Sequence, residues 1–378
     1  MQEKFLIINE SSSALKFSLY EMPEYKEIVN LNFEKIGNKL DYEIIIQSML
    51  NKLLNNKLIE SLDEIKGVGY KVLYNGIFFE NAIDISEEET DYLSTINPLN
   101  ITNKRFINYV KFMLPNATHT AVFDSAFHKT IHNSNFILNK KKSETHGLSH
   151  KYITQYMKKL AVREDIDIIN CYIDKDASIC AIKEGKSNYI SLSLTPLECL
   201  VIDKNTNNLE PSIIEFISDF KNISIDDAKK IIRENNLKNI SDTNDIKSLL
   251  ELSRKGNKIA RITIDKFTNF ITKNIFTSFA KLNGEVNAII ITANIGENSK
   301  EFRKIIMDKL TSLFDIFLDE SENKKIGKYN EHQCGVISTN NSIIPVFVIP
   351  TNEELIILEE TYKLSKKDVL VKKLITNK

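Results

Sequence analysis

The sequence has few of the residues that build metal sites and disulfides. It contains no tryptophan and four cysteines, Cys171, Cys180, Cys199 and Cys334, whose spacing is unlike that of metal ligands. Scattered cysteines of this kind predict a reduced protein of the cytoplasm. Isoleucine, asparagine and lysine are abundant where tryptophan is missing, which is typical of an AT-rich genome and indicates no function.

Long apolar runs and an excess of charge are also absent. No run approaches the roughly 20 residues of a membrane-spanning helix, and the N-terminal Met-Gln-Glu-Lys leads into a short strand-like run, so we expect no membrane span and no signal peptide. A net charge of −1 gives no reason to expect nucleic acid or an anionic membrane as a partner. The 378 residues, 42% of them hydrophobic, suffice for two domains with full cores.

Predicted strands and helices alternate along the chain. Both halves begin with a strand followed by a hairpin, at 5–20 and 166–193, and this twofold pattern predicts two similar α/β domains, although no sequence repeat accompanies it. The other strands are expected at 27–33, 65–73, 120–123, 286–292 and 344–349. Helices are expected at 42–54, 106–113, 149–160, 213–220, 225–234, 258–282, 299–313 and 352–372.

The turn of the first hairpin is rich in hydroxyl groups. From Asn9 to Lys16 it reads Asn-Glu-Ser-Ser-Ser-Ala-Leu-Lys, and it offers backbone N–H groups, hydroxyls and one lysine. Such a loop suits the phosphates of a nucleotide. An ordinary polar hairpin turn has the same composition, so this stretch alone leaves both interpretations open.

The turn resembles the first motif of acetate kinases, Asn-x-Gly-Ser-Ser-Ser-x-Lys, and further matches follow in that family's order over nearly the whole chain. They are Gly-Tyr-Lys-Val-Leu-Tyr-Asn-Gly at 69–76, Val-Phe-Asp-Ser-Ala-Phe-His at 122–128, Thr-His-Gly-Leu-Ser-His-Lys-Tyr at 145–152, Thr-Pro-Leu-Glu at 195–198, Thr-Ala-Asn-Ile-Gly-Glu-Asn-Ser at 292–299 and Val-Ile-Pro-Thr-Asn-Glu-Glu-Leu at 348–355. The chain is therefore identified from its sequence as a member of the acetate kinase family.

The resemblance implies an α/β fold, namely the duplicated, actin-like two-domain fold of the sugar kinase and Hsp70 superfamily, with the nucleotide in an interdomain cleft. It implies an N-terminal domain of residues 1–126 plus 355–378 and a C-terminal domain of residues 127–354. The final helix is expected to pack back onto the N-terminal domain through an apolar face formed by Leu355, Ile356, Leu358 and Tyr362.

The resemblance also implies roles for single residues. Asp124 is the implied catalytic acid/base, and it follows a buried strand, where α/β folds place their chemistry. His146 matches the family's transition-state histidine. Read without the family, Asp124 or Ser125 could cap the next helix, and His146 could be structural.

By the same resemblance, Mg²⁺ and ATP are the implied cofactor and co-substrate. Asn9 and Glu353 would place the metal, although an acidic residue such as Glu353 is also common at the start of a helix. The implied nucleotide contacts are Lys16, Ser12, Asp245, Ile295, Gly296 and Asn298. Asp245 belongs to Asn-Asp-Ile-Lys at 244–247, a less secure match.

Several positions of the family's motifs are substituted. Lys71 replaces a substrate-binding arginine and keeps its charge without the planar fork, while Asn205 replaces a second arginine and Ile96 a histidine. Asp174 and Asp176 replace the glycines of the second phosphate loop. A like-charge contact there costs roughly 1–4 kcal/mol, which the intervening lysine could partly offset. Asn294, in place of another glycine, is a milder change because asparagine tolerates positive φ.

Three functions follow from these matches and substitutions. The first is phosphorylation of acetate by ATP, giving acetyl phosphate and ADP, at a strongly reduced rate. The second is a catalytically inactive homologue that binds a nucleotide or a partner. A minor third is a butyrate or propionate kinase, because the sequence does not identify the acyl group. The expected partners are ATP or ADP, a small carboxylate and, as in the family, a second copy of the chain in a homodimer.

Overall fold

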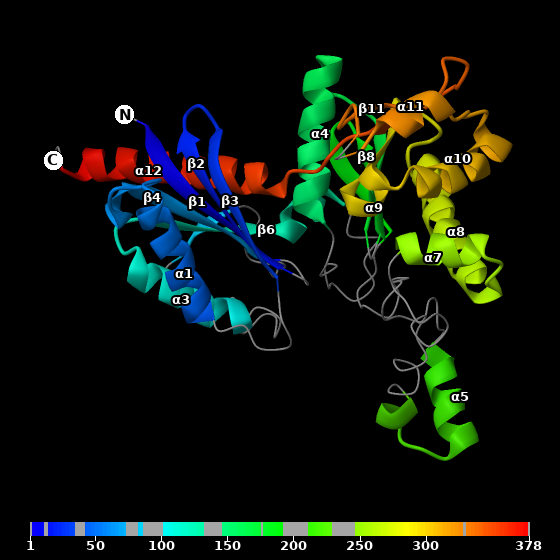
Figure 1. The fold of residues 1–378 in the computed structure, drawn as a ribbon, viewed down its shortest axis with the longest axis horizontal. Helices are drawn as coiled ribbons and strands as arrows, with labels where there is room; N and C mark the ends of the chain where they lie inside the picture. The colour runs from blue at the N-terminus through cyan, green and yellow to red at the C-terminus, as the bar shows by residue number, and fades with distance from the viewer. Residues whose placement is uncertain are drawn as a thin grey trace. The chain divides into compact units, whose positions relative to one another are not determined.

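The computed structural model describes residues 2–10, 14–34, 42–72, 82–85, 101–131, 146–174, 177–191, 211–228, 246–327 and 330–376. The chain divides into two compact units (Figure 1). Unit 1 consists of Met1–Ala126 and Asn352–Lys378, and unit 2 of Phe127–Thr351. The domain boundaries expected from the sequence stay a prediction. Within the described residues, no helix combines the length and apolar character that crossing a membrane requires.

Unit 1 contains a six-stranded mixed sheet in the order β3-β2-β1-β4-β6-β5. Strands β1, β2 and β3 form an antiparallel meander, β1, β4 and β6 are parallel, and β5 is antiparallel to β6. The strands are β1 (Glu3–Glu10), β2 (Ala14–Met22), β3 (Lys26–Glu34), β4 (Ile65–Val72), β5 (Ile83–Asp84) and β6 (Thr118–Phe123). The predicted first hairpin is confirmed, with Asn9 paired opposite Lys16.

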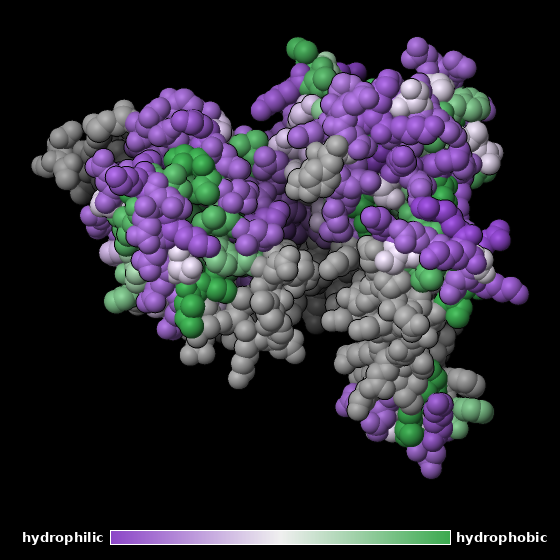
Figure 2. All heavy atoms as spheres, in the orientation of Figure 1, coloured by the Kyte–Doolittle hydropathy of each residue, from purple (hydrophilic) through white to green (hydrophobic). Residues whose placement is uncertain are grey.

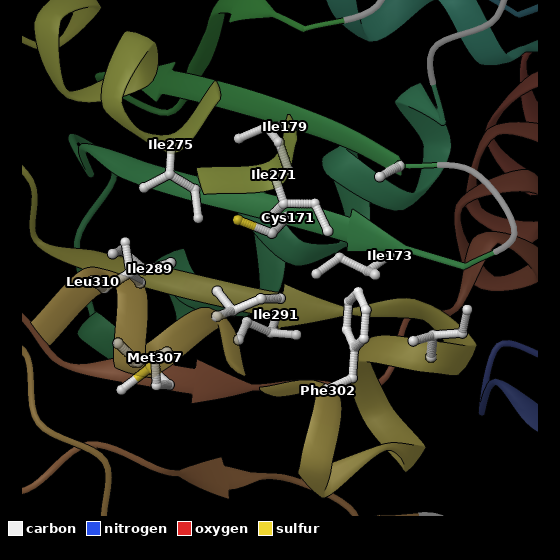
Figure 3. Close-up of a cluster of buried hydrophobic side chains, with 14 of the residues drawn as sticks. Cys171, Ile173, Ile179, Ile271, Ile275, Ile289, Ile291, Phe302, Met307 and Leu310 are labelled. Carbon is white, nitrogen blue, oxygen red and sulfur yellow. The ribbon is translucent and has the colours of Figure 1, made fainter. Parts of the chain in front are cut away.

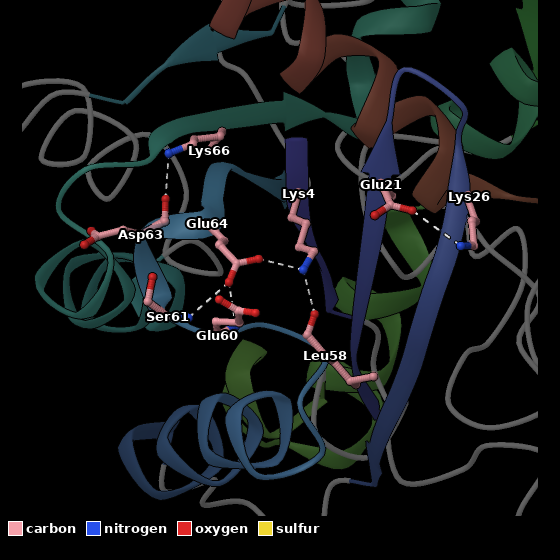
Figure 4. A network of polar contacts seen from close by, with 9 residues as sticks. All are labelled: Lys4, Glu21, Lys26, Leu58, Glu60, Ser61, Asp63, Glu64 and Lys66. Carbon is pink, nitrogen blue, oxygen red and sulfur yellow. Dashed lines mark hydrogen bonds and ion pairs between the residues drawn. The ribbon is translucent and has the colours of Figure 1, made fainter. Parts of the chain in front are cut away.

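One face of this sheet packs against helices α1 (Tyr42–Asn55) and α3 (Ile101–Met113). Because side chains alternate along a strand, Leu6 and Ile8 point to this face together. Helix α1 meets them with apolar residues at helical spacing, among them Ile46, Met49 and Leu53, all of which are buried. At the start of the sheet, Lys4 donates to Glu64 Oε2 at 2.7 Å and to the Leu58 carbonyl at 2.8 Å, as Figure 4 shows, which ties β1 to the turn before β4.

The other face of the unit 1 sheet is covered by the last helix, α12 (Glu353–Thr376), which packs on β1, β4 and β6. The prediction that this helix returns to the N-terminal part of the chain is confirmed. The approach is close: a Cβ added to Gly69 would lie 2.7 Å from Ile357 Cγ2 and would also collide with Thr361. The glycine of β4 therefore lets α12 lie directly against the sheet.

Unit 2 repeats the sheet of unit 1. Its order is β11-β12-β10-β7-β8-β9, with β7, β8 and β9 antiparallel, β7, β10 and β12 parallel, and β11 antiparallel to β12. The strands are β7 (Ile168–Ile173), β8 (Ala177–Lys183), β9 (Lys186–Ile190), β10 (Ala288–Thr292), β11 (Gly335–Val336) and β12 (Val346–Val348). The twofold pattern of the sequence is thus confirmed at the level of topology, strand for strand.

The unit 2 sheet is also covered on both faces. Helix α4 (Gly147–Ala161) packs on one, and α7 (Ile246–Arg254), α8 (Lys258–Lys281) and α10 (Lys300–Phe314) pack on or over the other. Figure 3 shows the larger core, in which Cys171, Ile179, Ile275, Ile291 and Met307 converge from strands and helices. Further helices of the described segments are α5 (Pro211–Lys221), α9 (Ala293–Asn298), α11 (Glu320–Lys325) and the 3₁₀ turns η1 (Leu62–Glu64) and η3 (Asp124–Thr130).

The element bounds differ from the sequence-based expectations mainly at their ends. The helix expected at 106–113 begins at Ile101, and the strand expected at 286–292 begins at Ala288. Of the helix expected at 225–234, residues 225–228 are helical and the rest lies outside the described residues. In the view of Figure 2, hydrophilic residues cover most of the described surface, and apolar residues are scattered over it.

Candidate active site

Charged and amide side chains of unit 1 meet where its parallel strands end. Asn9 follows the apolar part of β1, Lys71 lies near the end of β4, and Asp124 comes directly after β6. The amide of Asn9 donates to Glu353 Oε2 and to Glu354 Oε1, both at 3.1 Å. Lys71 Nζ lies 2.7 Å from Glu353 Oε2 and 3.9 Å from Asp124 Oδ1. We name Asn9, Lys71, Asp124 and Glu353 the ionic cluster.

Strand alternation and the start of one helix explain why these side chains meet. Asn9 follows Phe5 and Ile7 at every second position, and Lys71 follows Gly69, so both point to the face that α12 covers. Asn352 caps α12, because its Oδ1 accepts a hydrogen bond from the Leu355 N–H at 3.0 Å. The first helical residue, Glu353, therefore begins the helix at the strand ends. The structure brings Asn9, Asp124 and Glu353 together within unit 1, and their expected roles stay predictions.

Lys71 is a buried ammonium held between two carboxylates. Burial alone would lower its pKa, but the nearby Asp124 and Glu353 outweigh this effect and raise the pKa above its ordinary value. The lysine is therefore charged at neutral pH. At the edge of the cluster, the more exposed Lys16 lies 3.5 Å from Glu354 Oε1.

Asn9 Oδ1 is a buried acceptor that no group of the described residues satisfies. Leaving such an atom unpaired costs about 1–3 kcal/mol, so the position suits a cation or a hydrogen-bond donor. Amide and carboxylate oxygens are ligands that Mg²⁺ prefers, so Asn9 and Glu353 fit that metal. The described part of the chain holds no group of three His, Cys, Asp or Glu side chains placed to bind a metal. In proteins, Mg²⁺ usually takes most of its ligands from phosphates and water, beside one or two carboxylates.

In unit 2, His146 lies directly before α4. Its backbone is left-handed, with φ 49° and ψ 34°, which is uncommon for residues other than glycine. The ring stacks on Tyr172, with centroids 3.8 Å apart and planes at 7°. Its Nδ1 lies 2.9 Å from Ser178 Oγ. The ring position is thus set from two sides.

Behind His146, three buried polar side chains lie on the face of the sheet that α4 covers. Ser178 Oγ is also 2.9 Å from His150 Nε2, and His150 Nδ1 is 2.8 Å from Asn170 Nδ2. Burial lowers the pKa of His150 well below its ordinary value, and the neighbouring His128 and His146 act in the same direction. His150 is therefore neutral at physiological pH.

The motif match at 292–299, which carries three of the expected nucleotide contacts, forms α9, which begins at the end of β10. Gly296 packs on the sheet, because a Cβ there would lie 2.8 Å from Ile291 Cγ2. The amide of Asn298 donates to the Asn294 carbonyl at 3.0 Å and so turns toward its own helix. Ile295, the third predicted contact on this helix, is buried in the core.

The sequence model of the acetokinase family matches residues 4–359. The chain belongs to the acetokinase family. Acetate kinase of Aster yellows witches'-broom phytoplasma is 32% identical over 403 residues, covering 96% of this chain and 95% of that protein. Acetate kinase of Acholeplasma laidlawii is 31% identical, covering 96% of this chain and 100% of that protein. The chain is thus an acetate kinase-like protein.

Solved structures of an acetate kinase and a propionate kinase share the fold of this chain. A propionate kinase from Francisella tularensis superposes with a TM-score of 0.82 at 26% identity, covering 96% of this chain and 99% of that one. Acetate kinase from Porphyromonas gingivalis superposes with a TM-score of 0.81 at 23% identity, covering 96% and 99%. The expected duplicated, actin-like α/β fold with two domains is confirmed.

Two substituted glycine positions of the acetokinase motifs contact each other. Asn294 Nδ2 donates to Asp174 Oδ1 at 3.4 Å, between the end of β7 and the start of α9. The two departures from the family pattern therefore form one local feature. The predicted residues Ser12 and Asp245 lie outside the described residues, and so do the substituted positions Ile96, Lys175, Asp176 and Asn205.

Sequence reasoning missed a buried arginine that holds the segment of the motif match at 292–299. Arg303 is fully buried, and Nη1 donates to the carbonyls of Gly296 at 3.0 Å and Glu297 at 2.6 Å. Nε and Nη2 donate to Asn323 Oδ1 and O and to the Ile326 carbonyl. Burial lowers the pKa of Arg303 to about 10, still well above neutral. The guanidinium thus fixes the end of α9 to the end of α11.

Proposed function

We propose that this protein is an acetate kinase that works slowly. It transfers the γ-phosphoryl group of ATP to acetate: an oxygen of the carboxylate forms a bond to phosphorus, the bond to the ADP oxygen breaks, and acetyl phosphate and ADP leave. The observation that carries the proposal is the ionic cluster, in which a buried lysine and an unsatisfied amide oxygen lie beside two carboxylates. Membership of the acetokinase family supports it.

Lys71 is the proposed binding group for the carboxylate of acetate or the phosphate of acetyl phosphate. Its fixed charge can attract either anion, as a point charge without the two-pronged geometry of arginine. Asp124 is the proposed acid/base group. His146 is proposed to donate a hydrogen bond to the phosphoryl group in transfer.

Lys16 and Ser12 are proposed to contact the phosphates of ATP, and Ile295, Gly296, Asn298 and Asp245 the adenosine. Asn9 and Glu353 are proposed to hold Mg²⁺. When bound, this ion would neutralise charge on the phosphate oxygens. The buried Asn9 Oδ1 and the Glu353 carboxylate are the protein oxygens that support the assignment.

Three features support a reduced rate. Asn205 lacks the charge of an arginine, and an arginine on the transferring group is worth about 10³–10⁵ in rate. Asp174 carries a negative charge at the second phosphate loop, where Asn294 holds it. In the ionic cluster, Lys71 is already paired with Glu353, so a substrate anion must compete with a carboxylate for it.

The contact between Asp174 and Asn294 also favours the second candidate, an inactive homologue that binds a nucleotide or a partner, because it fills space at a proposed phosphate site. For the acyl group, we propose acetate ahead of propionate or butyrate. A cytoplasmic homodimer is proposed from the family resemblance, and light scattering of the purified protein would measure its mass.

Formation of acetyl phosphate by the purified protein tests the proposed function. The assay compares acetate, propionate and butyrate at equal concentrations with Mg²⁺ and ATP. Asp124→Ala, purified in the same way, controls for contaminating host kinase. We expect slow, acetate-preferring turnover that the variant loses. Equal rates in the two preparations would support the inactive homologue, and faster turnover of propionate or butyrate would change the assigned substrate.

A further inference from the structure

Four polar side chains of unit 2 form a continuous line of hydrogen bonds that ends at His146. From the inside outward, Asn170 Nδ2 lies 2.8 Å from His150 Nδ1, His150 Nε2 lies 2.9 Å from Ser178 Oγ, and Ser178 Oγ lies 2.9 Å from His146 Nδ1. Asn170, His150 and Ser178 are fully buried. Solvent therefore does not contact these three side chains behind His146.

The secondary structure places these groups on one face. Asn170 and Tyr172 are two positions apart on β7, and Ser178 stands opposite Tyr172 on β8, so all three point toward α4. His146 and His150 are four residues apart, which puts them on the same side of α4. The line is thus built into the register of one hairpin and one helix.

The chemistry of each group gives the line a direction. An amide nitrogen only donates, so His150 Nδ1 must accept, and neutral His150 then carries its proton on Nε2. That N–H donates to Ser178 Oγ, and among the described side chains the acceptor within reach of the Ser178 hydroxyl proton is His146 Nδ1. With Nδ1 accepting, neutral His146 carries its proton on Nε2.

Rotating the Asn170 amide would reverse every bond and place the His146 proton on Nδ1. In the observed orientation, the side-chain carbonyl oxygen of Asn170 is the buried atom that no group of the described residues satisfies. In the rotated orientation, the NH₂ group would be unpaired in its place. Unpaired buried N–H groups are rarer in proteins than under-satisfied carbonyl oxygens, which favours the observed direction.

We propose that Asn170, His150 and Ser178 are positioning residues that fix the tautomer of His146, so that its Nε2–H is held as a hydrogen-bond donor for an anionic phosphoryl or carboxylate oxygen. The role of this donor rests on the proposed kinase function, whereas the tautomer does not. A neutral donor held in place stabilises developing negative charge without reorienting during the reaction. Tyr172, stacked on the ring, fixes the plane in which the N–H points.

Nitrogen NMR of the histidine rings tests the tautomer directly. The full-length protein, labelled with ¹⁵N-histidine, is measured at about pH 8, above the ordinary histidine pKa near 6.5. The His146 signals are assigned by their loss in His146→Gln. We expect the proton of His146 on Nε2 and an unprotonated Nδ1. A His146 proton on Nδ1, or rapid averaging between the two tautomers, overturns the proposal.

A matched pair of variants at Ser178 tests whether the line of hydrogen bonds from Asn170 to His146, the relay, sets the tautomer. Ser178→Ala removes the hydroxyl and should let the His146 tautomers mix, whereas Ser178→Thr keeps it and should retain the wild-type signals. A His146 spectrum that is unchanged in Ser178→Ala would mean that the relay does not set the tautomer, and it overturns the proposal.

Kinetics separate this proposal from the proposed function. If the protein is an acetate kinase, Ser178→Ala should lower kcat about 10- to 100-fold with little change in KM, as loss of an outer-shell partner of a functional histidine does, and Ser178→Thr should restore it. If the protein is inactive, the NMR result still decides the tautomer. An unchanged kcat in an active Ser178→Ala protein overturns the role of the relay in catalysis.

Discussion

The two units have the same sheet but opposite chemistry at their strand ends. In unit 1, the ends of β1, β4 and β6 carry the ionic cluster, with Lys71 between Asp124 and Glu353. In unit 2, side chains of β7, β8 and α4 form a line of hydrogen bonds that reaches His146. Strand topology determines where functional groups gather, and the side chains determine whether the place attracts ions or orients a proton.

In the described residues, each unit holds a largely buried cation, Lys71 in unit 1 and Arg303 in unit 2, and the two are balanced differently. Lys71 of unit 1 is balanced by carboxylates, which raise its pKa. Arg303 of unit 2 donates only to carbonyl and amide oxygens, and burial lowers its pKa to about 10. Lys71 is thus held by carboxylates, whereas the hydrogen bonds of Arg303 join the end of α9 to the end of α11.

Removing the charge of Lys71 should have the largest effect. Lys71→Met leaves Asp124 and Glu353 buried as neighbouring like charges, and breaking a buried ion pair in this way costs about 3–5 kcal/mol. We expect that loss in the free energy of unfolding, measured by urea denaturation, together with loss of acetyl phosphate formation. Lys71→Arg, which keeps the charge, is the matched control. A stable Lys71→Met protein would mean that the cluster is not held by its charges.

Removing Arg303 should destabilise unit 2 by about 3 kcal/mol, because buried carbonyls at the ends of α9 and α11 lose their donors. Arg303→Met tests this by urea denaturation. In contrast to the variant of the ionic cluster, nucleotide affinity should fall with stability, since α9 carries the proposed adenosine contacts. Arg303→Lys keeps the charge but not the forked guanidinium. Its free energy of unfolding should lie between those of the unmodified protein and Arg303→Met. An unaffected α9, judged by nucleotide binding, would contradict this positioning role.

A buried histidine of unit 1 should make stability depend on pH. His119 bonds to Tyr70 and to the Leu114 carbonyl, and burial lowers its pKa to about 4, whereas the unfolded chain has the ordinary value near 6.5. Between these values the unfolded state binds a proton that the folded state does not, so stability is lost as pH falls from 6.5 to 4. The full loss is about 3 kcal/mol.

His119→Gln, which can donate and accept but does not titrate, should flatten this part of the profile. Unfolding free energies of the two proteins are compared at several pH values in the same window. His150 of unit 2 is also buried and neutral, so the variant should retain part of the acid sensitivity. Identical profiles for both proteins would show that His119 carries none of it.

The sequence predicted the fold and singled out the members of the ionic cluster, but not their contacts. Period-two and helical patterns located the strands and helices, and the motifs pointed to Asn9, Lys71, Asp124 and Glu353. The patterns could not show how Glu353 reaches Asn9 across nearly the whole chain, because this depends on how closely α12 lies against the sheet, which Gly69 permits. Nor could they show that Lys71 pairs with both carboxylates.

Unit 2 was harder to predict, because its contacts depend on register and on the backbone. Period two could have shown that Asn170 shares a face with Tyr172, but only the β7–β8 register places Ser178 between two histidines. Arg303 bonds largely to backbone carbonyls, which no side-chain pattern reveals. In the sequence, it is one more charged residue in the first turn of an amphipathic helix.

Acetyl phosphate formation by a repaired variant tests the proposed slow kinase most directly. The variant combines Asp174→Gly, Lys175→Asn, Asp176→Gly and Asn205→Arg, and the unmodified protein and an acetate kinase relative are assayed beside it. If the ionic cluster of unit 1 is intact and the substitutions of unit 2 limit the rate, the repaired variant should turn over at least about 10³-fold faster than the unmodified protein. An unmodified protein as fast as the relative, or a folded repaired variant with no gain in rate, would contradict the account.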